Sequence, residues 1–158
     1  MRQIKIFIAL VIVIISFTAT STFAQRSGTG LGLMLGEPTG VNLKSWISES
    51  SAFDVGLAWS FTHEGSLHIH ADYLYHNYNL INSDIPFYVG IGGRIKLHNT
   101  SEGGKDDARL GVRVPVGLDF FIKDIPVDIF VEIAPIVDLT PSTEVTFNGG
   151  VGFRYFFK

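Results

Sequence analysis

Ala108 to Phe121 reads ARLGVRVPVGLDFF, and this stretch decides the fold. Apolar side chains occupy every second position, with charged or compact residues between them. The apolar row is Leu110, Val112, Val114, Val116, Leu118 and Phe120, and the other row is Arg109, Gly111, Arg113, Pro115, Gly117 and Asp119. Successive side chains of a β-strand point to opposite faces, so the pattern predicts a strand with one unbroken apolar face. At about 3.3 Å per residue, the stretch is long enough to cross a bilayer at a tilt.

The composition narrows the class of protein. The chain has 158 residues, enough for one domain, and 46% are hydrophobic while only 17% are charged. An average soluble domain carries about 25% charged residues. After the N-terminus, no run approaches the roughly 20 apolar residues that a membrane helix needs. The net charge of −3 argues against a nucleic-acid partner, and the lack of cysteine excludes disulfides and a thiol nucleophile.

The N-terminal residues 1–24 have the features of a secretory signal peptide. Arg2 and Lys5 give a positive start, an apolar run follows, and Thr22 to Ala24 offers a small-x-small cleavage site. The sequence therefore predicts cleavage after Ala24, export from the cytoplasm and a mature domain over residues 25–158.

Turn residues divide the mature region into eight alternating segments. They are Thr29–Gly36, Val41–Ile47, Ala52–Phe61, Ser66–His76, Phe87–Leu97, Ala108–Phe121, Val127–Leu139 and Thr143–Phe157. Asn77 to Pro86 is expected to be a longer connection. Pro115 and Pro135 cannot donate ladder hydrogen bonds, so they predict local gaps in the ladder without breaking the strands. We interpret the chain as an all-β, eight-stranded, antiparallel up-and-down transmembrane β-barrel.

The residues between the apolar positions favour a barrel in lipid over a barrel in water. They are mostly small residues interleaved with isolated charges, which suits a narrow interior. The apolar row is nearly free of charge, and aromatic residues such as Trp59 and Tyr73 lie near segment ends, where an interfacial girdle would form. The alternative is a soluble periplasmic, lipocalin-like barrel whose apolar row lines a cavity for an apolar ligand.

A signal peptide, eight alternating segments and a last strand with Phe153, Tyr155 and Phe157 in alternation resemble the small eight-stranded outer-membrane barrels of the OmpA/OmpX type. The resemblance covers residues 25–158. It implies a location in the outer membrane with both termini in the periplasm. It also implies contact with outer-membrane lipid and lipopolysaccharide, and recognition by the barrel insertion machinery. The sequence identifies no external partner.

The inward row is expected to hold a network of opposite charges. Its members are Lys44, Asp54, Asp72, Arg94, Lys96, Arg109, Arg113, Asp119, Asp128, Glu132, Glu144 and Arg154. Buried charges are tolerated when they are paired, and eight strands enclose a space that side chains fill. The sequence therefore predicts a salt-bridged plug and not a selectivity filter, in a non-enzymatic protein with an envelope structural or surface-interaction role.

A histidine cluster leaves one alternative open. Ser66, His68 and His70 share a face with Asp72 at a spacing of two. Such a set could bind a metal through imidazole and carboxylate groups, or supply a general base beside a serine, as in barrels that deacylate or acylate lipid A. We favour a structural role for these residues and expect no catalytic residue, cofactor or metal.

Overall fold

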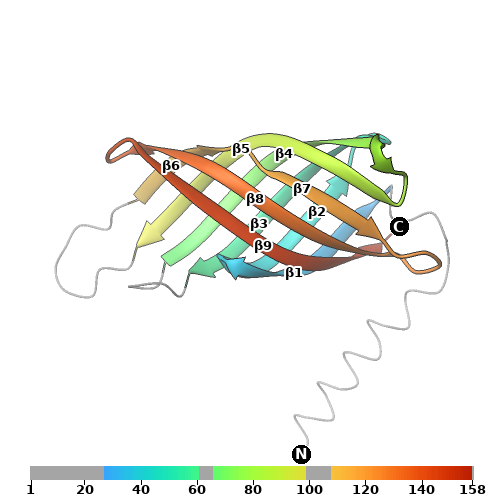
Figure 1. Cartoon of the computed structure of the whole chain (residues 1–158). Helices are drawn as coiled ribbons and strands as arrows, with labels where there is room; N and C mark the ends of the chain where they lie inside the picture. Colours follow the sequence, from blue (N-terminus) through green and yellow to red (C-terminus); the bar gives the residue numbers. More distant parts are fainter. Residues whose placement is uncertain (1–26, 61–65, 99–107, 158) are drawn as a thin grey trace, which may run out of the picture.

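The computed structural model describes residues 27–60, 66–98 and 108–157, and these form nine β-strands (Figure 1). The strands are β1 (Thr29–Glu37), β2 (Thr39–Trp46), β3 (Ser51–Ser60), β4 (Ser66–Asn82), β5 (Ile85–His98), β6 (Ala108–Arg113), β7 (Val116–Phe121), β8 (Val127–Thr140) and β9 (Glu144–Phe157). Within these ranges we find no helix with the length and hydropathy to cross a bilayer. The predicted signal peptide lies outside the described residues.

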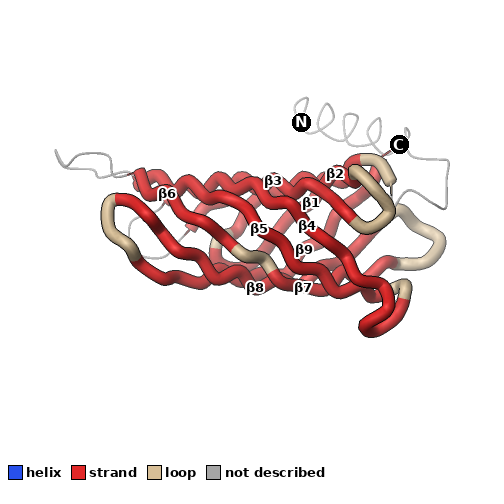
Figure 2. The backbone as a smooth tube through the Cα atoms, turned by 90° about the horizontal axis from the view of Figure 1, so that it is seen from above, coloured by secondary structure: helices blue, strands red, loops and turns tan. Residues whose placement is uncertain are grey.

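The strands close into an antiparallel ring of tilted staves (Figures 1 and 2). From β1 to β5, and again from β8 to β9, each strand pairs with the next strand of the chain, and β1 pairs with β9 to complete the ring. β6 and β7 both pair with β5 and β8, so together they make one stave. The ring is therefore eight-sided, which confirms the predicted all-β, up-and-down barrel.

The stretch from Ala108 to Phe121 is interrupted at Val114 and Pro115. Pairing resumes at once, because Gly90 N donates to Pro115 O at 2.8 Å and Val114 N donates to Pro135 O at 3.0 Å. Pro115 removes one donor and divides the stave into β6 and β7, whereas Pro135 lies within β8 without dividing it. The inside-outside alternation continues through both prolines.

The predicted connection from Asn77 to Pro86 is wrong. β4 continues to Asn82 and β5 begins at Ile85, with an irregular register between Asn77 and Asn82. The turn needs only two residues because Asn82 Oδ1 accepts hydrogen bonds from the backbone N–H groups of Asp84 and Ile85, at 2.9 and 2.8 Å. Asn side chains favour tight turns in this way. The asparagines of this stretch therefore belong to a long hairpin and not to a loop.

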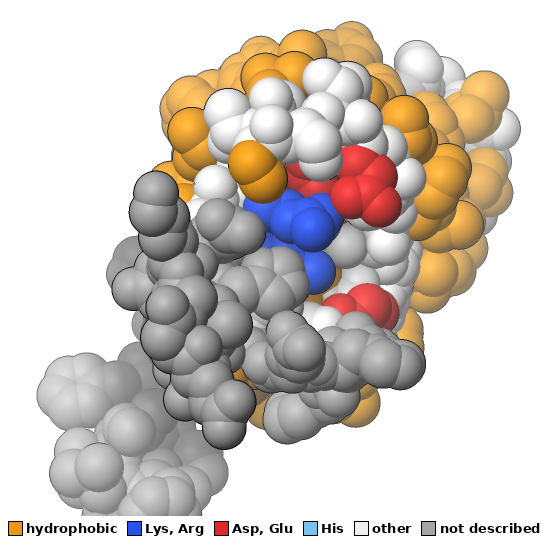
Figure 3. Space-filling model, turned by 90° about the vertical axis from the view of Figure 1, so that its left-hand side faces the viewer, with side chains coloured by type: hydrophobic (Ala, Val, Ile, Leu, Met, Phe, Trp, Pro, Cys, Tyr) orange, Lys and Arg blue, Asp and Glu red, His pale blue; other side chains and the backbone are white. Residues whose placement is uncertain are grey.

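The distribution of side chains is the reverse of that in a soluble protein. Among the described residues, seventeen polar or charged residues and ten hydrophobic ones are buried, and the largest fully buried side chains include Arg113 and Arg154. Large hydrophobic side chains such as Leu31, Phe53 and Ile133 face outward and are exposed. A view onto one end shows acidic and basic groups surrounded by hydrophobic side chains (Figure 3). The apolar row therefore does not line a cavity, and the lipocalin-like alternative is wrong.

Aromatic side chains fill the interior at one end. Trp46 at the end of β2 packs with Phe156 near the end of β9, and Phe121 at the end of β7 packs against them. Tyr88 is also fully buried inside the barrel. These strands end on the same side of the ring, so the interior is apolar at that end and charged beyond it.

Candidate functional site

The register of the strands brings the charged residues of the inner row together. Lys44 is the partner of Asp54 across β2 and β3, and Asp54 is the partner of Asp72 across β3 and β4. Asp128 faces Arg154 across β8 and β9. Partners on antiparallel strands point to the same face of the sheet, so all five side chains enter the interior.

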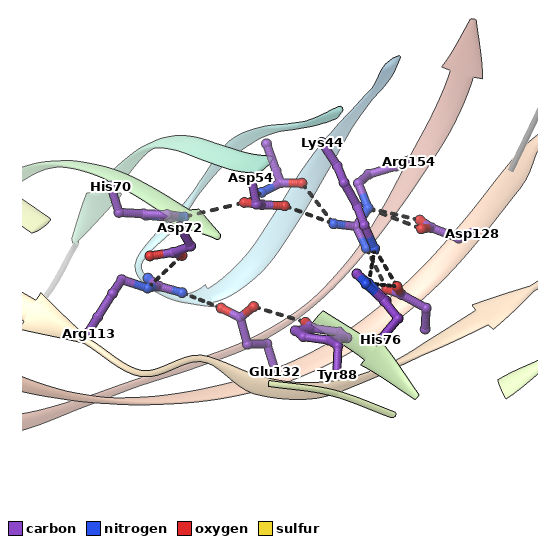
Figure 4. Close-up of polar contacts among 12 residues, drawn as sticks. Lys44, Asp54, His70, Asp72, His76, Tyr88, Arg113, Asp128, Glu132 and Arg154 are labelled. Carbon is purple, nitrogen blue, oxygen red and sulfur yellow. Dashed lines mark hydrogen bonds and ion pairs between the residues drawn. The ribbon is translucent and has the colours of Figure 1, made fainter. Parts of the chain in front are cut away.

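Arg154 lies at the centre of the network (Figure 4). Its Nε donates to Asp128 Oδ1 at 3.0 Å, one Nη donates to Asp54 Oδ2 at 3.0 Å, and the other donates to Asp119 Oδ1 at 2.6 Å. Its guanidinium group also lies 4.1 Å from the ring centre of Phe130. One side chain of β9 therefore connects carboxylates from β3, β7 and β8.

Lys44 extends the network toward the aromatic end. Its Nζ donates to Asp119 and lies 2.8 Å from His76 Nε2, which is itself 3.1 Å from Asp119 Oδ2. The same ammonium group lies 4.6 Å from the ring centre of Trp46. Lys44 is fully buried, so hydrogen bonds and aromatic contacts replace the water that an exposed lysine would bind.

Arg113 holds a second set of acids. Its Nε lies 2.9 Å from Asp72 Oδ2, and one Nη donates to Glu132. Tyr88 Oη donates to the other oxygen of Glu132 at 2.9 Å. One guanidinium group is therefore shared between two carboxylates.

The remaining predicted charges lie toward the opposite end. Arg94 donates to both oxygens of Asp138 at 2.6 and 2.7 Å, with both side chains buried. Arg109 pairs with Glu144 at 2.8 Å, and both side chains are partly exposed to solvent. Lys96 is partly exposed, and none of the ion pairs between described residues includes it.

Glycines on neighbouring strands leave the space that the large inner side chains need. A Cβ added at Gly32 would lie 2.6 Å from Arg154 Cγ, and one added at Gly117 would lie 2.5 Å from Tyr88 Oη. Gly32 is the strand partner of Arg154, and Gly117 is the partner of Tyr88. The glycines of the inner row are therefore needed as small residues opposite long ones.

The histidine cluster divides into two parts. Ser66 Oγ and His68 Nε2 are 3.0 Å apart, and both residues are buried. His70 faces a different partner, because its Nε2 lies 3.8 Å from Asp54 Oδ1. The structure thus separates His70 from the serine and places it beside two carboxylates, those of Asp54 and Asp72.

The predicted network omits several residues that the structure adds, and four of them make close contacts with its members. Asp138 pairs with Arg94, His76 contacts Lys44, Tyr88 donates to Glu132, and Asn42 donates to Asp54. Each occupies an inward position of its strand, so a rule that included every polar residue of the inner row would have found them.

The model of the DUF3996 family, described as a protein of unknown function, matches residues 20–157. The chain belongs to this family. No curated protein matches the sequence. The DUF3996 chain is thus assigned to its family by sequence.

Two solved structures have the same fold as this DUF3996 chain. The N-terminal β-barrel domain of OprF from Pseudomonas aeruginosa superposes with a TM-score of 0.64 and 10% sequence identity, covering 82% of this chain and 95% of that domain. Neisserial surface protein A superposes with a TM-score of 0.59 and 14% identity, covering 82% of this chain and 93% of the other. The fold is that of the small outer-membrane barrels, as the sequence pattern predicted.

Proposed function

We propose that this protein is a closed, non-conducting barrel of the outer membrane with a structural or surface-interaction role and no enzymatic activity. The observation that carries the proposal is the combination of a filled, ion-paired interior with an exterior of exposed hydrophobic side chains. Hydrocarbon requires an apolar, uncharged outer face, and charged groups on that face cost free energy at the midplane. Outer-membrane lipid and lipopolysaccharide are the expected surroundings of that face.

Two features of the interior oppose ion flow. Arg154 and Lys44 connect acids from several staves and are almost completely buried, so they occupy the interior next to the aromatic end of the barrel. Trp46, Phe121 and Phe156 fill the section toward one end. An eight-stranded barrel encloses a space that is just wide enough for side chains, so this packing leaves no aqueous path.

Planar bilayer recordings test the closed barrel. The refolded protein should insert without producing steady single-channel conductance, and large, stable openings would contradict the proposal. Location is tested separately by membrane fractionation and by heat-modifiable migration on a gel, which a folded membrane barrel shows and a soluble protein does not. Recovery of the protein in the soluble fraction would contradict the membrane location.

The biogenesis of the barrel follows from the same proposal. Residues 1–24 would direct export, and the alternating aromatic residues Phe153, Tyr155 and Phe157 of the last strand would be read by the barrel insertion machinery. Replacing all three with serine should leave the protein in the periplasm without entering the outer membrane. Unchanged insertion of this variant would refute the role of the last strand.

The Ser66 and His68 pair supports one second candidate, an enzyme that modifies lipid A. The 3.0 Å separation suits activation of a serine by an imidazole. The burial of both groups inside the barrel works against it, because an acyl chain in the membrane meets the outer face. Lipid A mass spectra from strains with and without the gene decide between the two candidates, and unchanged spectra are expected.

A further inference from the structure

Three buried side chains of the interior bring possible metal-binding atoms together. Asp54 on β3 and His70 and Asp72 on β4 each offer one ligand atom, and these atoms lie within 4.8 Å of one another. Figure 4 shows the three side chains converging beside Arg113. We propose that Asp54, His70 and Asp72 form a binding site for one divalent first-row metal ion, with Zn²⁺ as the probe.

Asp54 accepts hydrogen bonds from Asn42 and Arg154, whereas His70 and Asp72 have donor atoms that the described part of the protein leaves without a hydrogen-bond partner. Asp72 and His70 are each only 2% exposed. Among the described residues, neither Asp72 oxygen accepts a well-aligned hydrogen bond and His70 Nδ1 has no hydrogen-bond partner, although Asp72 Oδ2 lies near Arg113. Buried polar groups are normally satisfied by hydrogen bonds or by a metal. The unmet capacity of Asp72 therefore points to a ligand.

The charge balance gives an independent reason. The two ion-paired groups that meet at this site together contain three cationic side chains and five carboxylates. They are Lys44, Arg113 and Arg154, with Asp54, Asp72, Asp119, Asp128 and Glu132. Counted by residue type, the acidic side chains exceed the basic ones by two, and Arg94 does not compensate because Asp138 engages it. A divalent cation between Asp54 and Asp72 would supply the missing charge.

The geometry can accommodate an ion after a small adjustment. His70 Nε2 and Asp54 Oδ1 are 3.8 Å apart. Four ligands at about 2.1 Å from a tetrahedral ion are roughly 3.4 Å from one another, so donors that are now up to 4.8 Å apart need to close by up to about 1.4 Å. Gly56 and Gly92 provide the space, because an added Cβ would lie 2.5 Å from His70 Nε2 and 2.0 Å from Asp72 Oδ1, respectively.

The donor set favours particular ions. One imidazole and two carboxylates suit Zn²⁺ and neighbouring first-row ions better than Mg²⁺ or Ca²⁺, which take oxygen ligands. Water would complete the coordination. The bound ion would also link β3 to β4, and this link would stabilise the ion-pair network that includes Asp54 and Asp72.

The test measures Zn²⁺ retained by the refolded, tag-free barrel after dialysis, by elemental analysis. The unaltered barrel should keep about one ion per chain. In His70→Ala and Asp72→Asn the affinity for Zn²⁺ should fall by more than the roughly 10- to 100-fold that is lost when a residue that only orients a metal ligand is removed. His68→Ala is the matched control, because His68 is also buried on β4 but lies outside the site, and it should retain the ion. No retained ion in the unaltered barrel, or equal retention in His70→Ala, would overturn the proposal.

A second measurement does not depend on the folding of a variant. Co²⁺ added to the unaltered barrel should give paramagnetically shifted imidazole proton signals from a coordinated histidine, and Zn²⁺ should remove them by displacement. Absence of such signals would mean that protons balance the two negative charges, and the metal site would be rejected.

Discussion

Arg154 donates a 2.6 Å hydrogen bond to Asp119, a residue 35 positions earlier in the chain, and neither side chain has appreciable contact with solvent. Asp119 belongs to the stretch that predicts the fold, and Arg154 belongs to the strand that closes the ring. Because Arg154 also reaches Asp54 and Asp128, the closing strand is tied to three others through one guanidinium group.

Replacing Arg154 with alanine should destabilise the folded barrel strongly. The change would leave three buried carboxylates without their common partner, and breaking a buried ion pair from one side costs about 3–5 kcal/mol. Urea unfolding in detergent micelles measures the free energy. The control is Arg109→Ala, whose pair with Glu144 is partly exposed and should contribute at most about 1 kcal/mol. Equal losses in the two variants would show that the interior network adds no stability.

The Arg94 and Asp138 side chains should be energetically coupled. Arg94→Met leaves Asp138 charged and buried, so it should destabilise the barrel by several kcal/mol, on the order of the cost of one unpaired buried charge. Adding Asp138→Asn removes that charge and should recover most of the loss. The same unfolding measurement gives the coupling energy by a double-mutant cycle. A double variant as unstable as the sum of the two single changes would rule out this coupling.

Two adjacent glycines of β5 should respond in opposite ways to alanine. At Gly92 the added Cβ would lie 2.0 Å from Asp72 Oδ1 and 2.2 Å from Ala71 O, so overpacking should cost about 1–3 kcal/mol. At Gly93, which faces outward, the nearest atom is 3.9 Å away, and alanine should stabilise the strand by roughly 0.5–1 kcal/mol. Thermal unfolding of both variants tests the prediction. Destabilisation at Gly93 as large as at Gly92 would mean that interior space does not explain the cost at Gly92.

A charge on the outer face should be harmful in proportion to its depth in the bilayer. Ile133 lies in the middle of β8 and Leu139 near its end, and both side chains are exposed on the outside. Arginine should cost about 2–4 kcal/mol at Ile133 and about 0–1 kcal/mol at Leu139. Folding into lipid vesicles provides the measurement. Equal tolerance at both positions would indicate that water surrounds the outer face.

Much of the fold follows from the local pattern. The alternation in Ala108 to Phe121 places Arg113 and Asp119 on the face opposite the valines, and the same rule applies to every other stave. The errors occur where local chemistry is ambiguous. Asn77 to Pro86 has the composition of a loop but forms a long hairpin, because the side chain of Asn82 closes a two-residue turn.

The candidate site was predictable only as a set of residues. Glu132, Asp72 and Arg113 were expected to point inward, yet nothing in their spacing says that Arg113 holds both acids. His70 illustrates the limit most clearly. Its sequence neighbours suggested a set with Ser66 and His68, whereas strand pairing places it beside Asp54.

The sequence by itself determined which face of each strand is apolar, the number of staves and the sign of every interior charge, because a strand alternates with a period of two whatever its partners are. Only the tertiary structure decided which acid meets which base. Those contacts join residues up to 100 positions apart, as between Arg154 and Asp54, and depend on the register of each strand and on the closure of β1 with β9. Register is a property of pairs of strands. A shift by one residue would exchange the inner and outer faces of a strand, so the register is fixed when the whole ring buries its charged side chains together.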